Sequence, residues 1–122
     1  MKIYEAIRQA DLTANNDIET ERKYAWLQTL DNMLIKDVFN KHVGTERDFV
    51  TYDGKTDPET ELTVKGTYED VYVQWLISKY YWEQAEWERY NNAALQVGET
   101  IRAFKEDFHK DHTPKSVPHL MF

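Results

Sequence analysis

The feature that most constrains this fold is a seam of apolar residues in the last third of the chain. Between residues 87 and 108 the apolar positions recur in alternating steps of three and four: Trp87, Tyr90, Ala94, Val97, Ile101, Phe104 and Phe108. Such spacing places them along one side of an α-helix. It predicts a helix over residues 86–110, about 37 Å long at 1.5 Å per residue. The seam offers a surface for packing against another helix or another subunit.

Three further helices are predicted upstream of this one, over residues 3–10, about 18–41 and about 68–84. The second has an apolar stripe at helical spacing and is followed by Gly44, a common helix stop. The third is apolar or aromatic almost all the way round, which indicates burial on more than one side. We expect a break near Gln84 between the third and fourth helices.

Residues 45–67 differ from the rest of the chain. Turn signals divide this segment at Asp53-Gly54, Asp57-Pro58 and Gly66. Two short β-prone stretches lie between the turns, so the segment is interpreted as a long surface loop or a small β-hairpin. The prediction is therefore an all-α protein of about four helices. It comprises one domain over residues 1–112 and an extended C-terminal tail over residues 113–122.

Composition excludes several classes of function. The 122 residues carry a formal net charge of −7, which argues against nucleic-acid binding through a broad basic face. Cysteine is absent, which excludes disulfides, thiolate metal sites and cysteine nucleophiles. No apolar run reaches the roughly 18 residues of a membrane-spanning helix, and the polar N-terminus has no signal-peptide core. We expect synthesis in the cytoplasm and no membrane partner.

Two histidines are the main candidates for metal chemistry. His109 and His112 are three residues apart on the last helix, with Asp111 between them and His119 in the tail. A structural zinc site takes four ligands, and neither an HExxH motif nor any cysteine is present. The interpretation preferred here is two solvated histidines near a helix C-terminus, where positive charge is favourable. We expect no metal and no cofactor.

No arrangement of residues predicts catalysis. The carboxylates Glu83, Glu86 and Glu88 could form an acid–base pair, but nothing in the sequence desolvates one and not another. A nucleophile elbow, a glycine-rich phosphate loop and a triad are all missing. The chain is therefore interpreted as a non-enzyme.

Two short segments stand out as candidate protein interfaces. The first is Arg89-Tyr90-Asn91-Asn92, in which two adjacent asparagines are poor helix formers. This block is either an exposed stretch or a polar network across a helix or subunit contact. The second is Leu120-Met121-Phe122, an apolar tip on an arm stiffened by Pro114 and Pro118. It predicts a docking peptide, and the alternative is a chain end packed on the domain's own core.

Several motifs together resemble a known family. The first half contains Glu5-Ala6-Ile7, Ala10-Asp11, Asn15 and Lys23-x-x-Trp26-Leu27-x-x-Leu30-Asp31. The second half contains Tyr68-Glu69-Asp70-Val71-Tyr72, Glu88-Arg89-Tyr90-Asn91-Asn92, Phe104, Phe108, His112 and Pro114. This pattern is similar to the head–tail connector, or adaptor, proteins of tailed phages and prophages. It departs from the family pattern at Lys65-Gly66-Thr67 and at Gln84-Ala85, where proline and Asn-Gly are usual.

The resemblance implies a structural virion protein at the head–tail junction. Its subunits would form a ring, commonly of twelve, beneath the portal and extend the DNA channel. Expected partners are other copies of the chain, the portal, and the next connector, stopper or tail-completion protein. DNA would pass through without sequence-specific binding. Two alternatives stay open: a head- or tail-completion (stopper) protein, and a dimeric helical regulatory or adaptor module that pairs through the 87–108 seam.

Overall fold

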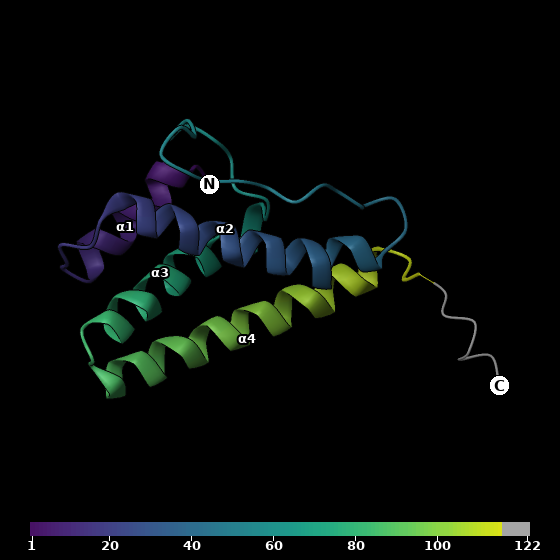
Figure 1. The fold of residues 1–122 in the computed structure, drawn as a ribbon. Coiled ribbons are helices and arrows are strands. Elements are labelled where there is room, and N and C mark those ends of the chain that lie inside the picture. Colours follow the sequence, from purple (N-terminus) through teal and green to yellow (C-terminus); the bar gives the residue numbers. More distant parts are fainter. Residues whose placement is uncertain (116–122) are drawn as a thin grey trace.

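The computed structural model describes residues 1–115, and over that range the chain is helical (Figure 1). The helices are α1 (Ile3–Thr13), α2 (Thr20–Asp37), α3 (Asp70–Glu83) and α4 (Trp87–Asp111), with 3-10 turns η1 (Phe39–Lys41) and η2 (Gly66–Tyr68). The predicted all-α class with four helices is confirmed. No helix in the described range is both long enough and apolar enough to cross a bilayer.

Helix α2 is shorter than the sequence predicted. It begins at Thr20 and ends at Asp37, and the chain continues through η1. The early end has a local cause, because side chains take carbonyl groups that a longer helix would use. The His42 ring donates to the Val38 carbonyl at 2.8 Å, and the Thr45 hydroxyl donates to the Phe39 carbonyl at 2.8 Å. These bonds replace further i to i−4 bonds and turn the chain away from the helix axis.

Helix α3 is the central element, as its all-round apolar pattern predicted. It packs against α1, α2 and α4. The residues that it buries most completely are Val71, Tyr72, Leu76 and Tyr80. A hydrogen bond also joins α3 to α2: the Trp75 indole donates to the Trp26 carbonyl at 2.8 Å. A helix in contact with three others has no face that tolerates a run of charged residues.

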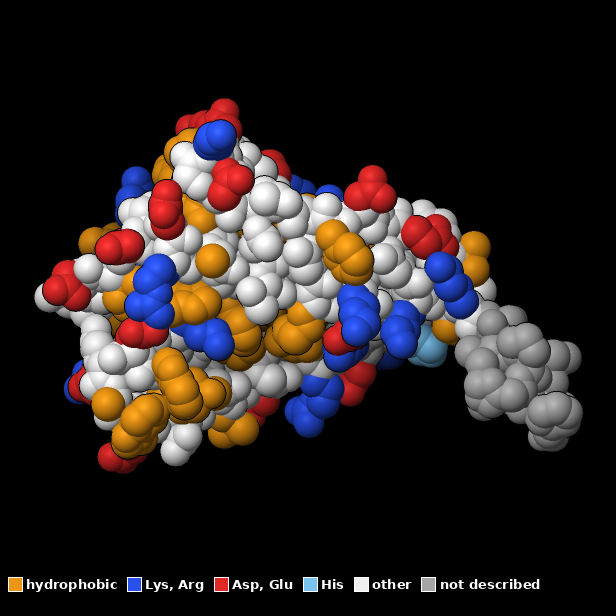
Figure 2. Space-filling view, in the orientation of Figure 1, with side chains coloured by type: hydrophobic (Ala, Val, Ile, Leu, Met, Phe, Trp, Pro, Cys, Tyr) orange, Lys and Arg blue, Asp and Glu red, His pale blue; other side chains and the backbone are white. Residues whose placement is uncertain are grey.

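A tight corner joins α3 to α4, so the predicted break near Gln84 is confirmed. Ala85 adopts a φ of 55°, in the left-handed region, and its amide donates to the Trp82 carbonyl. The chain reverses within three residues, and α4 then runs back along α3 (Figure 1). Hydrophobic side chains gather on the surface at this end of the molecule (Figure 2).

Residues 45–67 form no strand and only one isolated bridge, between Lys2 and Glu61. The hairpin alternative is wrong, and the segment is a long loop whose residues are mostly exposed. Several of its residues are buried in the core, namely Tyr52, Leu62, Thr63 and Val64. The segment crosses the surface at its turns and is held to α2 and α3 between them.

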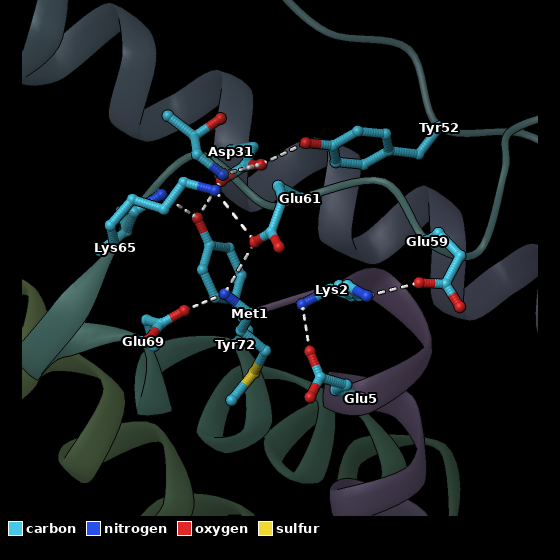
Figure 3. A network of polar contacts seen from close by, with 12 residues as sticks. Met1, Lys2, Glu5, Asp31, Tyr52, Glu59, Glu61, Lys65, Glu69 and Tyr72 are labelled. Carbon is cyan, nitrogen blue, oxygen red and sulfur yellow. Dashed lines mark hydrogen bonds and ion pairs between the residues drawn. The ribbon is translucent and has the colours of Figure 1, made fainter.

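The anchor for this segment is Asp31, a fully buried carboxylate of α2. It accepts 2.5 Å hydrogen bonds from the hydroxyls of Tyr52 and Tyr72, and a 3.1 Å bond from the Thr63 amide (Figure 3). Burial, reinforced by the neighbouring Asp31 carboxylate, raises the pKa of both tyrosines. The phenols therefore stay protonated and serve as donors to the carboxylate.

The predicted seam of α4 is mostly used inside the chain. Phe104 and Phe108 are buried and lie 6.0 and 5.0 Å from the ring of Phe39 in η1. At the other end of the seam, Trp87 is exposed. The C-terminal half of the seam is thus occupied by the chain's own core, and only its start faces solvent. This arrangement leaves little of the seam for the dimeric alternative.

Candidate interaction surfaces

The Arg89–Asn92 block lies in the first turns of α4, beside the α3–α4 corner. Arg89 is exposed, with its guanidinium 5.8 Å from the Tyr81 ring centre and 3.8 Å from the Glu86 carboxylate. Asn91 and Asn92 are exposed, and their side chains form no hydrogen bond with any residue of the range 1–115. The block is thus exposed at Arg89, Asn91 and Asn92 and half-buried at Tyr90. Its role in a subunit contact stays a prediction.

Three aromatic rings next to this block form a cluster that we call the aromatic corner: Trp82, Trp87 and Tyr90. The Trp82 ring packs edge-on against Trp87 at 5.1 Å and against Tyr90 at 5.4 Å. Both tryptophans remain 52% exposed. Trp82 is not among the predicted interface residues, because the all-round apolar pattern of the third helix indicated burial. The available signal was that Trp82 and Trp87 flank the predicted break.

Carboxylates surround the aromatic corner. Glu83 pairs with Arg22 of α2, and this hydrogen bond lowers the pKa of Glu83. Glu86 faces Arg89, while Glu88 forms no ion pair with any of the described residues. The corner is therefore an apolar surface bordered by three carboxylates and two arginines.

A second surface lies at the far end of α4. It is a solvent-open groove of about 480 Å³, which we call the terminal groove, lined by Asp37, Val38, Lys41, His42, Lys105, Glu106, His109, Pro114 and Lys115. Figure 2 shows Lys or Arg side chains and a histidine gathered on this end of the molecule. Lys115 pairs with Glu46 at 3.3 Å, whereas Lys41 and Lys105 form no ion pair within residues 1–115.

The sequence suggested that His109 and His112 could lie together, but the structure places His109 beside His42. His109 Nδ1 lies 3.4 Å from His42 Nε2, and His42 Nδ1 donates to the Val38 carbonyl. The His112 ring instead stacks on Phe108 at 3.9 Å. Spacing along one helix did not reveal His42, which is 67 positions from His109. Residues 1–115 contain no group of three or more His, Asp or Glu side chains arranged to hold a metal ion.

The start of the C-terminal tail is attached to the η1 region. The Val43 amide donates to the Thr113 carbonyl at 2.8 Å, and the Lys115 amide donates to the Lys41 carbonyl at 3.0 Å. Pro114 lies in the bridge between these bonds and lines the terminal groove. The other predicted docking residues of the tail lie outside the described residues: Pro118, Leu120, Met121 and Phe122.

Comparisons of the chain with protein-family models, curated proteins and solved structures found no match. Functional inference therefore depends on the residues and surfaces of this chain alone.

Proposed function

We propose that this chain is a head–tail connector (adaptor) subunit of a tailed phage or prophage, which forms a ring on the portal. The observation that carries the proposal is the aromatic corner, with two half-exposed tryptophans beside the exposed Arg89–Asn92 block. These side chains contribute little to the subunit's own core. A partner is the simplest reason for keeping them on the surface.

The chemistry of the corner is that of a protein interface. Trp, Tyr and Arg are the residues most enriched among those that dominate binding energy at protein contacts. The corner presents Trp82, Trp87, Tyr90 and Arg89 together, on two helices fixed by a tight turn. The same stretch includes Arg89–Asn92, and this block, placed after the Tyr68–Tyr72 helix start, is the most specific part of the resemblance to connector proteins.

The charge of the chain also fits a connector. A net charge of −7 suits the wall of a channel through which DNA passes without adhering. In this proposal the subunits form a ring, commonly of twelve in this family, and the tail contacts the portal. The finished ring lies at the head–tail junction of the virion and meets the next connector or stopper.

The test is electron microscopy of the protein mixed with its cognate portal. We expect a ring of added density on one face of the portal. A Trp82→Ala/Trp87→Ala variant should fail to form this ring, while Phe49→Ala, which alters an even more exposed aromatic residue elsewhere, should form it normally. Portal particles that stay bare at saturating protein concentration would rule out the connector role. A stopper would instead bind only after another connector is in place.

A further inference from the structure

We propose that copies of this chain associate head to tail, with the aromatic corner of one copy seated on the terminal groove of the next. The inference rests on the proposed function, which requires subunits to contact one another, and it names the two faces that meet. The occupant of each face is a second copy of the same chain.

Charge complementarity between the two faces supports this pairing. The corner is bordered by three glutamates: Glu83 pairs with Arg22, Glu86 faces Arg89, and Glu88 has no ion-pair partner among the described residues. The groove is bordered by three lysines, and two of them, Lys41 and Lys105, form no ion pair with the described residues. Asp37 and Glu106 also line the groove, so both margins are mixed in charge, with carboxylates in excess at the corner and lysines in excess at the groove.

The two faces also match in their apolar parts. Pro114 contributes exposed apolar surface to the groove, whereas Val38, which also lines it, is only 1% exposed. The groove volume of about 480 Å³ lies in the range of pockets that enclose small ligands. The chain itself shows how its cations meet indole rings, because Lys79 Nζ lies 4.3 Å from the Trp75 ring centre. A groove lysine that stacks on Trp87 of a neighbour would make the same contact.

The positions of the two faces determine what such an interface builds. They lie at opposite ends of α4, which spans 25 residues and is therefore about 37 Å long. Since the faces differ, the contact is heterologous, and a pair of copies leaves the groove of one and the corner of the other free for further neighbours. Repeated heterologous contacts generate closed rings or open filaments, whereas a two-fold contact stops at a dimer.

Cysteine cross-linking tests the pairing directly, because the natural chain contains no cysteine. Asn91→Cys places a thiol one turn from Trp87, and Glu106→Cys places one in the groove; both positions are exposed and leave Glu88, Lys41 and Lys105 intact. Mixed under mild oxidation, these two variants should form a mixed disulfide dimer at least tenfold faster than either does with Gln9→Cys, an exposed control on α1.

Charge reversal adds a second, independent measurement. Glu88→Lys in the Asn91→Cys protein should slow cross-linking about two- to fivefold, as expected for loss of an exposed ion pair. Lys105→Glu in the Glu106→Cys protein should do the same. The two reversals combined across the interface should restore the rate, which a merely structural effect of either substitution would not do.

The outcomes separate this inference from the proposed function. Mixed dimers no faster than those with Gln9→Cys, or a preference for Asn91→Cys dimers with themselves, would overturn the head-to-tail interface even if rings form on the portal. Head-to-tail cross-linking without binding to the portal would leave the interface standing and remove the connector role.

Discussion

The Tyr72 hydroxyl of α3 donates a 2.5 Å hydrogen bond to Asp31 Oδ1 of α2, at a point with no exposure to solvent. The same hydroxyl accepts a bond from the Val64 amide at 2.7 Å. Tyr72 thereby joins the two helices to the segment that precedes α3. A polar centre of this kind fixes which segment packs where, because each group has its partner only in one arrangement.

Replacement of Asp31 by alanine should lower the free energy of unfolding by about 3 kcal/mol or more, because it leaves buried hydroxyl and amide donors without an acceptor. Tyr52→Phe removes a single donor and should cost about 1–2 kcal/mol. Urea unfolding followed by circular dichroism measures both. Equal losses for the two variants would show that Asp31 does not organise the centre.

The buried tyrosines should make the fold sensitive to alkali. Burial is the largest cause that raises the pKa of Tyr52, Tyr72 and Tyr80 above the ordinary value of 10.0. A raised pKa means that the unfolded chain loses phenolic protons first. Stability is therefore full below about pH 10 and falls as the pH rises above it.

Absorbance at 295 nm during an alkaline titration, measured together with circular dichroism, checks this expectation. Some of the eight tyrosines should ionise only as the helical signal is lost. Complete ionisation of all eight before any unfolding would contradict the burial of these three rings.

The ion pair between Lys23 and Asp11 gives a prediction at acidic pH. Lys23 is buried, and its Nζ lies 3.0 and 3.2 Å from the two carboxylate oxygens of Asp11. Partial burial of Asp11 opposes ionisation, but hydrogen bonds from Asn16 and Lys23 outweigh it and hold the pKa of Asp11 below its usual 3.8. A lowered pKa contributes stability that is complete above that value and is lost as the pH falls below it.

Asp11→Asn should therefore destabilise the fold by about 1–3 kcal/mol at neutral pH, because it leaves a buried ammonium without a counter-ion. Asp11→Asn should also weaken the fall in the free energy of unfolding as the pH becomes acidic. Adding Lys23→Met to Asp11→Asn should recover most of the loss, since the unpaired charge is then removed. A double variant no more stable than Asp11→Asn would contradict this explanation.

The α3–α4 corner should be improved by glycine. Ala85 has a φ of 55°, a conformation that costs a residue with a Cβ roughly 1–2 kcal/mol. Ala85→Gly removes that cost. Glycine also raises the conformational entropy of the unfolded chain, which offsets part of the gain in stability. We expect a net stabilisation of about 0.5–1 kcal/mol in thermal or urea unfolding. Ala93→Gly, in the helical part of α4, is the matched control and should destabilise.

Two truncations separate the tail's role in folding from its role in docking. Removal of residues 116–122 should leave stability unchanged within about 0.5 kcal/mol. Removal of residues 113–122 also deletes the bonds of Thr113 and Lys115 to the η1 region and should cost about 1 kcal/mol. The proposed function predicts that both forms fold but fail to bind the portal. Unchanged portal affinity for both would show that the tail is not the docking element.

The sequence by itself determined the four helices, the break near Gln84 and the central position of α3. These features depend on local periodicity and turn chemistry, which are determined by residues close together in the sequence. It did not determine how residues 45–67 are held, because the buried bonds of Asp31 join positions 21 to 41 residues apart. Turn signals marked where that segment bends and said nothing of its contact with α2.

Tertiary structure also decided which aromatic residues are buried and which are left exposed. Phe104, Phe108 and Trp87 share one periodic seam, yet only the phenylalanines meet Phe39. His109 and His112 share one helix end, yet His109 meets His42 from a distant part of the chain. Periodicity fixes the face of a helix on which a side chain lies, and only the packing of the other elements fixes how much of that face is covered.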